Sequence, residues 1–294
     1  MIVALLIGLG TLLSAPDDST LKNISYHSFD EKLESSINAI YRADFEHAHQ
    51  LFGELKEAAP EDPRPHFFEA LIPFWEFFLV EERPELAADF LQKTDRAAAL
   101  GERKLNQSPG DTTTVLLLSG VHGYRSLVAA RQSNYRVAIS SGITGFNYTR
   151  KLLSLDSGRP DAQIGRGMFN YMAGSVPREL RWLTNSFGVR GDIETAFKLL
   201  EETANSDDIV SNDALMMLMV LKEKEGDLEE AYHYAYRLCE RFPDNVIFLF
   251  KKASIAEKLG RNDAAKSYYQ RIVDIQNRYL ADLNELASER LKLI

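Results

Sequence analysis

The residues best suited to metal or nucleophilic chemistry are few and scattered along the chain. It has six histidines and one cysteine, Cys239. His47 and His49 are two residues apart, which on a helix turns their side chains about 200° apart around the axis rather than onto one face. Cys239 has no base beside it in sequence and is typical of a small buried residue. We therefore expect no metal site, no cofactor and no cysteine-based catalysis.

Sequence motifs of common enzymes are also missing. The chain has no glycine-rich phosphate loop ending in Gly-Lys-Ser/Thr, no His-Glu-x-x-His and no Gly-x-Ser-x-Gly. Lys and Arg total 34 against 43 Asp and Glu, a formal net charge of −9 that disfavours general binding to nucleic acid. These observations predict a protein that is not an enzyme and that does not bind nucleic acid.

Two groups of aromatic and charged residues could instead form a binding surface. The densest apolar segment is residues 67–80, which includes Trp75. It is either the core of a helix pair or the wall of a hydrophobic groove or cavity. In the second group, arginines could bind carboxylates or stack on aromatic rings, or could form ion pairs with the chain's own acidic residues. Its candidate binding residues are Arg166, Tyr171, Arg181 and Trp182.

The elements that must position these residues are predicted to be helices. Apolar residues recur at helical spacing almost without interruption after Ser28, and strand signals are scarce. Most prolines lie between these periodic segments, where helices begin and end. Pro73 lies inside an apolar run, where we expect it to bend or break the helix.

A repeat near the C-terminus defines the fold. Three similar segments begin at Gly191, Gly226 and Gly260, which are 35 and 34 residues apart. A glycine can end one helix, and a small residue early in the next helix lets the two approach closely. The small residues, each five positions after its glycine, are Ala196, Ala231 and Ala265, and Ala48 has the same phase near the N-terminus.

This pattern resembles the tetratricopeptide repeat (TPR) family, whose repeat is a helix–turn–helix of about 34 residues. The resemblance is specific over residues 30–60 and 191–276, whereas residues 65–174 form longer helix pairs. The chain is also similar to bacterial exported TPR proteins with enlarged middle repeats and to the Iml2/TTC39-type arrangement. The resemblance implies an all-α, right-handed α-solenoid of about six stacked antiparallel pairs, closed by a helix in residues 275–294. It also implies a noncatalytic scaffold that binds a protein or peptide.

Partners of such solenoids commonly bind on the concave face, which the first helices of successive pairs line. From the phase of the repeats, the candidates on that face include Tyr41, Asn185, Met216, Val220, Glu223, Phe250, Ser254 and Glu257. An alternative function is the binding of an apolar small molecule in a cavity of the aromatic-rich middle, near Tyr124, Tyr135 and Phe146.

The N-terminal residues predict where the protein works. Residues 1–15 are uncharged, and their apolar run is too short to span a membrane but matches a secretory signal peptide. We expect residues 16–294 to form one TPR-like domain without a stable membrane span, exported and periplasmic in a bacterium. If residues 1–15 are instead a buried first helix, the protein is cytoplasmic.

Overall fold

The computed structural model describes residues 28–155, 160–176, 190–206 and 210–294. These residues form thirteen α-helices and one short π-helix, η2, and they contain no strand. Residues 1–15 and the helix expected near residues 178–187 lie outside the described part. The elements in chain order are α1 (Phe29–Tyr41), α2 (Phe45–Ala58), α3 (Pro63–Trp75), η2 (Glu76–Val80), α4 (Pro84–Gln107), α5 (Thr112–Arg131), α6 (Tyr135–Leu155), α7 (Pro160–Gly174), α9 (Ile193–Ala204), α10 (Val210–Glu225), α11 (Leu228–Arg241), α12 (Val246–Lys258), α13 (Asn262–Ile275) and α14 (Ala281–Leu293).

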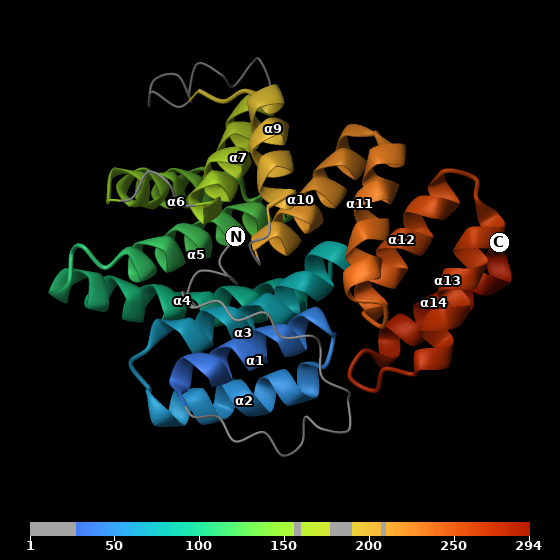
Figure 1. The fold of residues 1–294 in the computed structure, drawn as a ribbon, viewed down its shortest axis with the longest axis horizontal. Helices are drawn as coiled ribbons and strands as arrows, with labels where there is room; N and C mark the ends of the chain where they lie inside the picture. Colours follow the sequence, from blue (N-terminus) through green and yellow to red (C-terminus); the bar gives the residue numbers. More distant parts are fainter. Residues whose placement is uncertain (1–27, 156–159, 177–189, 207–209) are drawn as a thin grey trace.

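The described helices pack in pairs that follow one another along the chain (Figure 1). The pairs are α1 with α2, α3 with α4, α5 with α6, α7 with α9, α10 with α11, and α12 with α13, and α14 packs on the last of them. One hydrophobic cluster runs through the stack, from Leu33 in α1 to Ala287 in α14. The predicted all-α solenoid is confirmed. Its closing helix begins at Ala281 rather than at residue 275, because α13 continues to Ile275 and ends at Gln276, whose backbone is left-handed.

The small residues of the repeat lie where the sequence places them. Ala48, Ala196, Ala231 and Ala265 are all fully buried in the second helix of a pair. A larger side chain at these positions would push the paired helices apart, because packed interiors leave little free volume.

Two of the three repeat glycines end a helix as predicted. Gly226 and Gly260 have left-handed backbones, with φ of 83° and 72°. In each turn the next residue closes the helix end: the Asp227 N–H donates to the carbonyl oxygen of Lys222, and the Arg261 N–H to that of Ala256, both at 2.9 Å. This is the Schellman motif. Gly191 has another role, because a Cβ there would lie 2.4 Å from the Asn170 carbonyl oxygen.

The same turn occurs twice without glycine. Ala43, between α1 and α2, and Ser133, between α5 and α6, have φ of 57° and 58°. The Asp44 N–H donates to the Ala39 carbonyl oxygen at 2.9 Å, and the Asn134 N–H to that of Ala129 at 2.8 Å. A residue with a Cβ adopts this conformation at a cost of roughly 1–2 kcal/mol. The helix pairs at the N-terminus and in the middle therefore share the turn geometry of the C-terminal repeats.

Pro73 does not break its helix, where the sequence predicted a bend or a break. The α3 helix passes through Pro73 and ends at Trp75, and the chain then widens into the π-helix η2. At its end, the Glu81 N–H donates to the carbonyl oxygen of Glu76 at 3.0 Å, a bond that spans five residues. Proline removes one backbone donor from the helix but can be accommodated near its end, where regular α-helical bonding stops.

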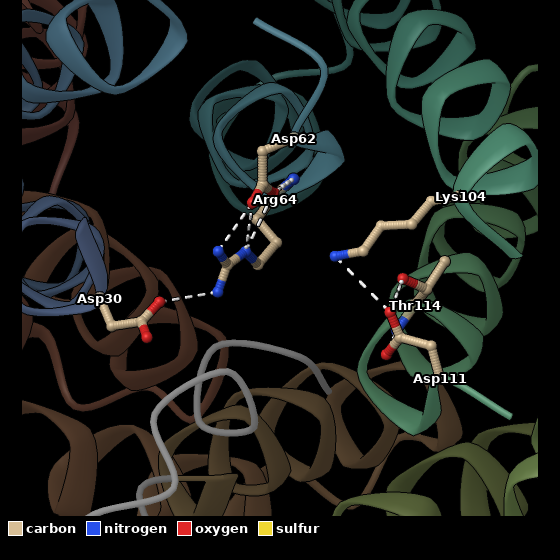
Figure 2. A network of polar contacts seen from close by, with 6 residues as sticks. All are labelled: Asp30, Asp62, Arg64, Lys104, Asp111 and Thr114. Carbon is tan, nitrogen blue, oxygen red and sulfur yellow. Dashed lines mark hydrogen bonds and ion pairs between the residues drawn. The ribbon is translucent and has the colours of Figure 1, made fainter. Parts of the chain in front are cut away.

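Aspartates fix the starts of two first helices (Figure 2). Asp62 caps α3, accepting the Arg64 backbone N–H at 2.9 Å. The Arg64 guanidinium binds both Asp62 oxygens and reaches Asp30 in α1, with an Nη1–Oδ1 distance of 2.8 Å. Asp111 caps α5 and lies 3.5 Å from the ammonium of Lys104 in α4. These contacts fix the angle between consecutive pairs.

Candidate functional site

The two ends of the solenoid touch each other. Helices α1 and α3 pack against the start of α10, the turn before α12 and α12 itself, although these segments are far apart in sequence (Figure 1). We call this region the closure contact. Its residues are Tyr41, Trp75, Asp213, Phe242, Asn245 and Phe248.

Two buried hydrogen bonds join the ends. The Tyr41 hydroxyl donates to Oδ1 of Asp213 at 2.6 Å. The Asn245 amide donates to the backbone carbonyl of Tyr41 at 2.8 Å, while its oxygen caps α12. Burial and the neighbouring Asp213 both raise the pKa of Tyr41 well above its usual value. The phenol therefore stays protonated and remains a donor at physiological pH.

Aromatic rings surround these hydrogen bonds. The Tyr41 ring stacks on Phe242 at a centroid distance of 5.1 Å and meets the Trp75 ring edge-on, also at 5.1 Å. Trp75 in turn lies 5.3 Å from Phe248 of α12. Such pairs stabilise a contact beyond the apolar area they bury. The closure contact is thus a continuation of the hydrophobic core.

A polar rim extends the closure contact toward α14. The Nδ1 atom of His49 lies 3.1 Å from Oε1 of Glu69, and its Nε2 atom lies 2.9 Å from the hydroxyl oxygen of Tyr279, in the turn before α14. Lys56 donates to Glu69 at 2.8 Å. Burial alone would raise the pKa of Glu69, but its hydrogen bonds to His49 and Lys56 outweigh burial and lower that pKa to about 2. Glu69 is therefore a carboxylate at physiological pH.

Four predicted binding residues are buried, and two of them, Tyr41 and Trp75, lie in the closure contact. Tyr41, Trp75 and Met216 are each 1% exposed, and Val220 is 5% exposed. The sequence places them on first helices, as expected for a concave face, but in this structure the ends of the chain and neighbouring helices cover them. Their apolar side chains belong to the core and offer no surface to a partner.

Two further candidates, Arg166 and Tyr171 on α7, are not part of the closure contact. Tyr171 is almost fully buried and donates a hydrogen bond to Glu225 of α10; burial and this carboxylate raise its pKa. Arg166 is exposed, and its guanidinium donates to the Gln163 side chain at 3.1 Å. Arg181, Trp182 and Asn185 lie outside the described residues.

Glu223 on α10 and Glu257 on α12 are predicted residues that stay partly accessible on first helices, and so are Phe250 and Ser254. Both are half-buried on α12. The Phe250 ring meets Tyr269 of α13 edge-on at 5.7 Å, which holds it in place. These two residues lie on the helix that also carries Lys251 and Lys258.

Charged residues form a strip over α5, α10 and α12. We define this charged strip as Arg131, Glu223, Lys251 and Lys258. Glu223 accepts from the Lys251 ammonium at 2.5 Å and from the Lys258 ammonium at 2.7 Å. Burial opposes ionisation of Glu223, yet the two lysines outweigh it and lower the pKa of Glu223. Burial lowers the pKa of Lys251; the Glu223 carboxylate opposes this shift, and the nearby cations of Lys258 and Arg131 add to it.

The sequence points to only one member of the charged strip. The repeat phase predicts Glu223 on the concave face, whereas nothing in the sequence singles out Arg131, Lys251 or Lys258. Their grouping depends on α10 and α12 lying side by side, and the ion pairs from Glu223 span 28 and 35 residues. No local sequence signal marks such pairs, because single charged residues are common on helix surfaces.

The aromatic segment at residues 67–80 is part of the core. Phe67, Phe68 and Phe74 are fully buried. Phe74 packs on Phe90 of α4 and on Tyr124 of α5, at centroid distances of 5.5 and 4.6 Å. This segment thus joins the second helix pair to the third. None of its residues lines the cavity between α5, α6 and α7.

Metal-binding clusters and membrane-spanning helices are both missing from the described part of the chain. Within residues 28–155, 160–176, 190–206 and 210–294, no three metal-ligating side chains lie close enough to hold an ion. None of the helices in those ranges has the length and apolarity needed to cross a membrane.

The stacked helix pairs, their buried alanines and their recurring Schellman turns define a TPR-like α-solenoid. The chain belongs to the family described as Iml2/Tetratricopeptide repeat protein 39, which matches residues 131–286, more than half of its length. No match was found among curated proteins.

The chain is similar, at low sequence identity, to several solved structures. PilW, a widely conserved type IV pilus biogenesis factor, is 15% identical and aligns over 84% of this chain and 93% of its own, with a TM-score of 0.37. A thermophilic TPR protein of Thermus thermophilus is 12% identical over 91% of this chain and 100% of its own, with a TM-score of 0.34. A TPR protein from Parabacteroides merdae is 15% identical over 90% of both chains, with a TM-score of 0.32.

Proposed function

We propose that this protein is a noncatalytic TPR-type scaffold that binds another protein or peptide, in the bacterial cell envelope. The observation that carries the proposal is the stack of helix pairs in a family of repeat proteins. Such solenoids recognise partners over extended surfaces made by successive repeats.

The surface of α12 beside the charged strip is the best-supported site for the partner. Phe250 and Ser254 are partly accessible there, next to Lys258, whose side chain is 52% exposed. Partly buried aromatic residues with charged neighbours are typical of interface cores and rims. Because Lys251 and Lys258 together outweigh Glu223 in charge, we expect a segment with acidic residues beside an apolar one.

Affinity capture from fractionated bacterial extracts tests the scaffold role. The full chain is used as bait together with Ser254→Glu/Lys258→Glu, which changes the charge of this surface at exposed or half-buried positions. The matched control is Lys266→Glu on α13, which is exposed and lies away from the strip. We expect the wild type and the control to enrich the same protein at least tenfold more than the double variant. Equal enrichment by all three baits would refute this binding surface.

The envelope location rests on the sequence of residues 1–15, which match a secretory signal peptide. We expect the cellular protein to lose these residues and to begin near Pro16. Intact-mass measurement after osmotic release of the periplasm checks both points. A full-length protein retained in the cytoplasm would exclude export.

A further inference from the structure

Helices α5, α6 and α7 line a cavity that opens to the surface and that the proposed scaffold role does not use. Its volume is about 160 Å³, and Met217 of α10 forms part of its wall. None of the described residues that line it carries a charge. This volume is close to that of an engineered apolar cavity of about 150 Å³ that binds benzene or xenon.

Glycines line part of the cavity. The lining includes Gly123 of α5 and Gly142 and Gly145 of α6. A Cβ at Gly145 would lie 3.0 Å from the Gly123 backbone nitrogen and 3.1 Å from the Ser119 carbonyl oxygen, so α5 and α6 are in close contact there. A Cβ at Gly123 would meet nothing within 4 Å. Part of the wall is therefore bare backbone, and the space beside it is left unfilled.

The hydroxyl groups in the wall are already bound to the protein. Ser126 donates to the Ala138 carbonyl oxygen at 2.7 Å, and Thr149 donates to that of Gly145 at 3.1 Å. Ser119 lies 2.6 Å from the Thr149 hydroxyl. A polar ligand would thus compete with these bonds, and water would find few of the two to four partners that it needs in a buried site.

The cavity reaches the surface between α6 and α7. Ile139 is 38% exposed, and Ile143, Phe146, Met168 and Met172 are half-buried. Methionine side chains are flexible and polarizable, and they adapt to ligands of different shape. A molecule can therefore enter from solvent and find a wall that adjusts to it.

We propose that this cavity binds a small uncharged apolar molecule that presents an aromatic ring or a short hydrocarbon chain. A peptide fits it less well, because peptide N–H and C=O groups need hydrogen-bond partners when buried. The nearby hydroxyls of Ser126 and Thr149 already donate to backbone carbonyls. This site is independent of the partner surface on α12, so either can fail without the other.

Methionine methyl NMR on the full chain tests the proposal with benzene as the probe. Three of the six methionines, Met168, Met172 and Met217, line the cavity, and single Met→Leu variants assign their signals. Met216 and Met219 are buried on the same helix as Met217 but do not line it, so they are internal controls. We expect saturable shifts for the three lining methyls and none for the two controls. No shift up to the solubility limit of benzene, or equal shifts in all five, would overturn the proposal.

A cavity-filling variant supplies a second, independent measurement. We expect Gly123→Leu to weaken benzene binding at least tenfold, whereas Gly53→Leu, at a helical glycine whose added Cβ also meets nothing within 4 Å, leaves it unchanged. Circular dichroism checks that each variant folds. If a variant does not fold, the methionine shifts of the wild-type protein decide whether benzene binds in the cavity. Ethylbenzene should bind at least tenfold more tightly than N-acetylphenylalaninamide. The reverse order would assign the cavity to a side chain of a protein partner and refute a small-molecule site.

Discussion

The Tyr41→Phe variant removes one oxygen from the closure contact and leaves its ring packing in place. The Tyr41 hydroxyl donates at 2.6 Å to Asp213, which is 1% exposed. Removing one partner of a buried hydrogen bond leaves the other group less well satisfied, at a cost of about 1–3 kcal/mol. We therefore expect the variant to lose about 2 kcal/mol of stability at this contact, or roughly 30-fold in its opening equilibrium.

Hydrogen–deuterium exchange measures this loss of stability at both ends of the chain. Amide exchange should rise by about 30-fold in α1 and, in the same variant, around Asn245, whose side chain donates to the Tyr41 carbonyl. The control is Tyr236→Phe, which removes the same atom from a side chain that is 44% exposed. This control variant should change the amide exchange rates in both segments by less than twofold.

The result that would refute the reasoning is exchange that rises in α1 alone. The two ends of the solenoid would then open independently, and the hydrogen bond between Tyr41 and Asp213 would not couple them. A rise of less than threefold at both ends would show that the contact contributes little to closure.

Three further predictions follow from local geometry and charge. Ser133→Gly should raise the free energy of unfolding by about 0.5–1 kcal/mol, and Gly226→Ala should lower it by about 1 kcal/mol, because both positions have a left-handed backbone. Unchanged urea midpoints in these two variants would contradict the prediction. Asn245→Asp keeps an oxygen that can cap α12 but loses the N–H that donates to the Tyr41 carbonyl. The free energy of unfolding in urea should therefore fall by about 1–3 kcal/mol. A urea midpoint equal to that of the wild type would show that Asn245 only caps α12. The pKa of Glu69 is lowered from 4.5 to about 2, so its contribution of up to about 3 kcal/mol is present above pH 4.5 and lost as the pH falls toward 2. Glu69→Gln should therefore differ most from the wild type near pH 6 and least near pH 2, and parallel unfolding curves across this range would refute it.

Local features of the fold could be predicted because their causes lie within a few residues. Gly226 and Gly260 end helices through a backbone conformation that glycine adopts at low cost, and a buried alanine follows each of them. The turns at Ala43 and Ser133 have the same geometry but no glycine, so their left-handed backbones were hidden. At those positions packing and hydrogen bonding of the paired helices compensate for the strain, and neither can be read from residue type.

The candidate sites were harder to predict because they combine distant segments. Phe250 and Ser254 are partly accessible as expected, but Tyr41 and Trp75 are buried by helices from the other end of the chain. The aromatic middle does contain a cavity, which is lined by Tyr124, Phe146 and glycines of α5 and α6, whereas no residue of the aromatic segment at residues 67–80 lines it.

The sequence by itself determined the repeating unit near the C-terminus: its period, the glycines that end its helices at Gly226 and Gly260, and the alanines that are buried. These properties depend on side-chain size, backbone preference and helical periodicity, all of which act locally. The tertiary structure alone decided how far the stack curves and what its inner face meets. Tyr41 and Asp213 are 172 residues apart, and their contact depends on small rotations between pairs that accumulate along the stack. A change of a few degrees at each junction would move these two residues apart without altering any single repeat.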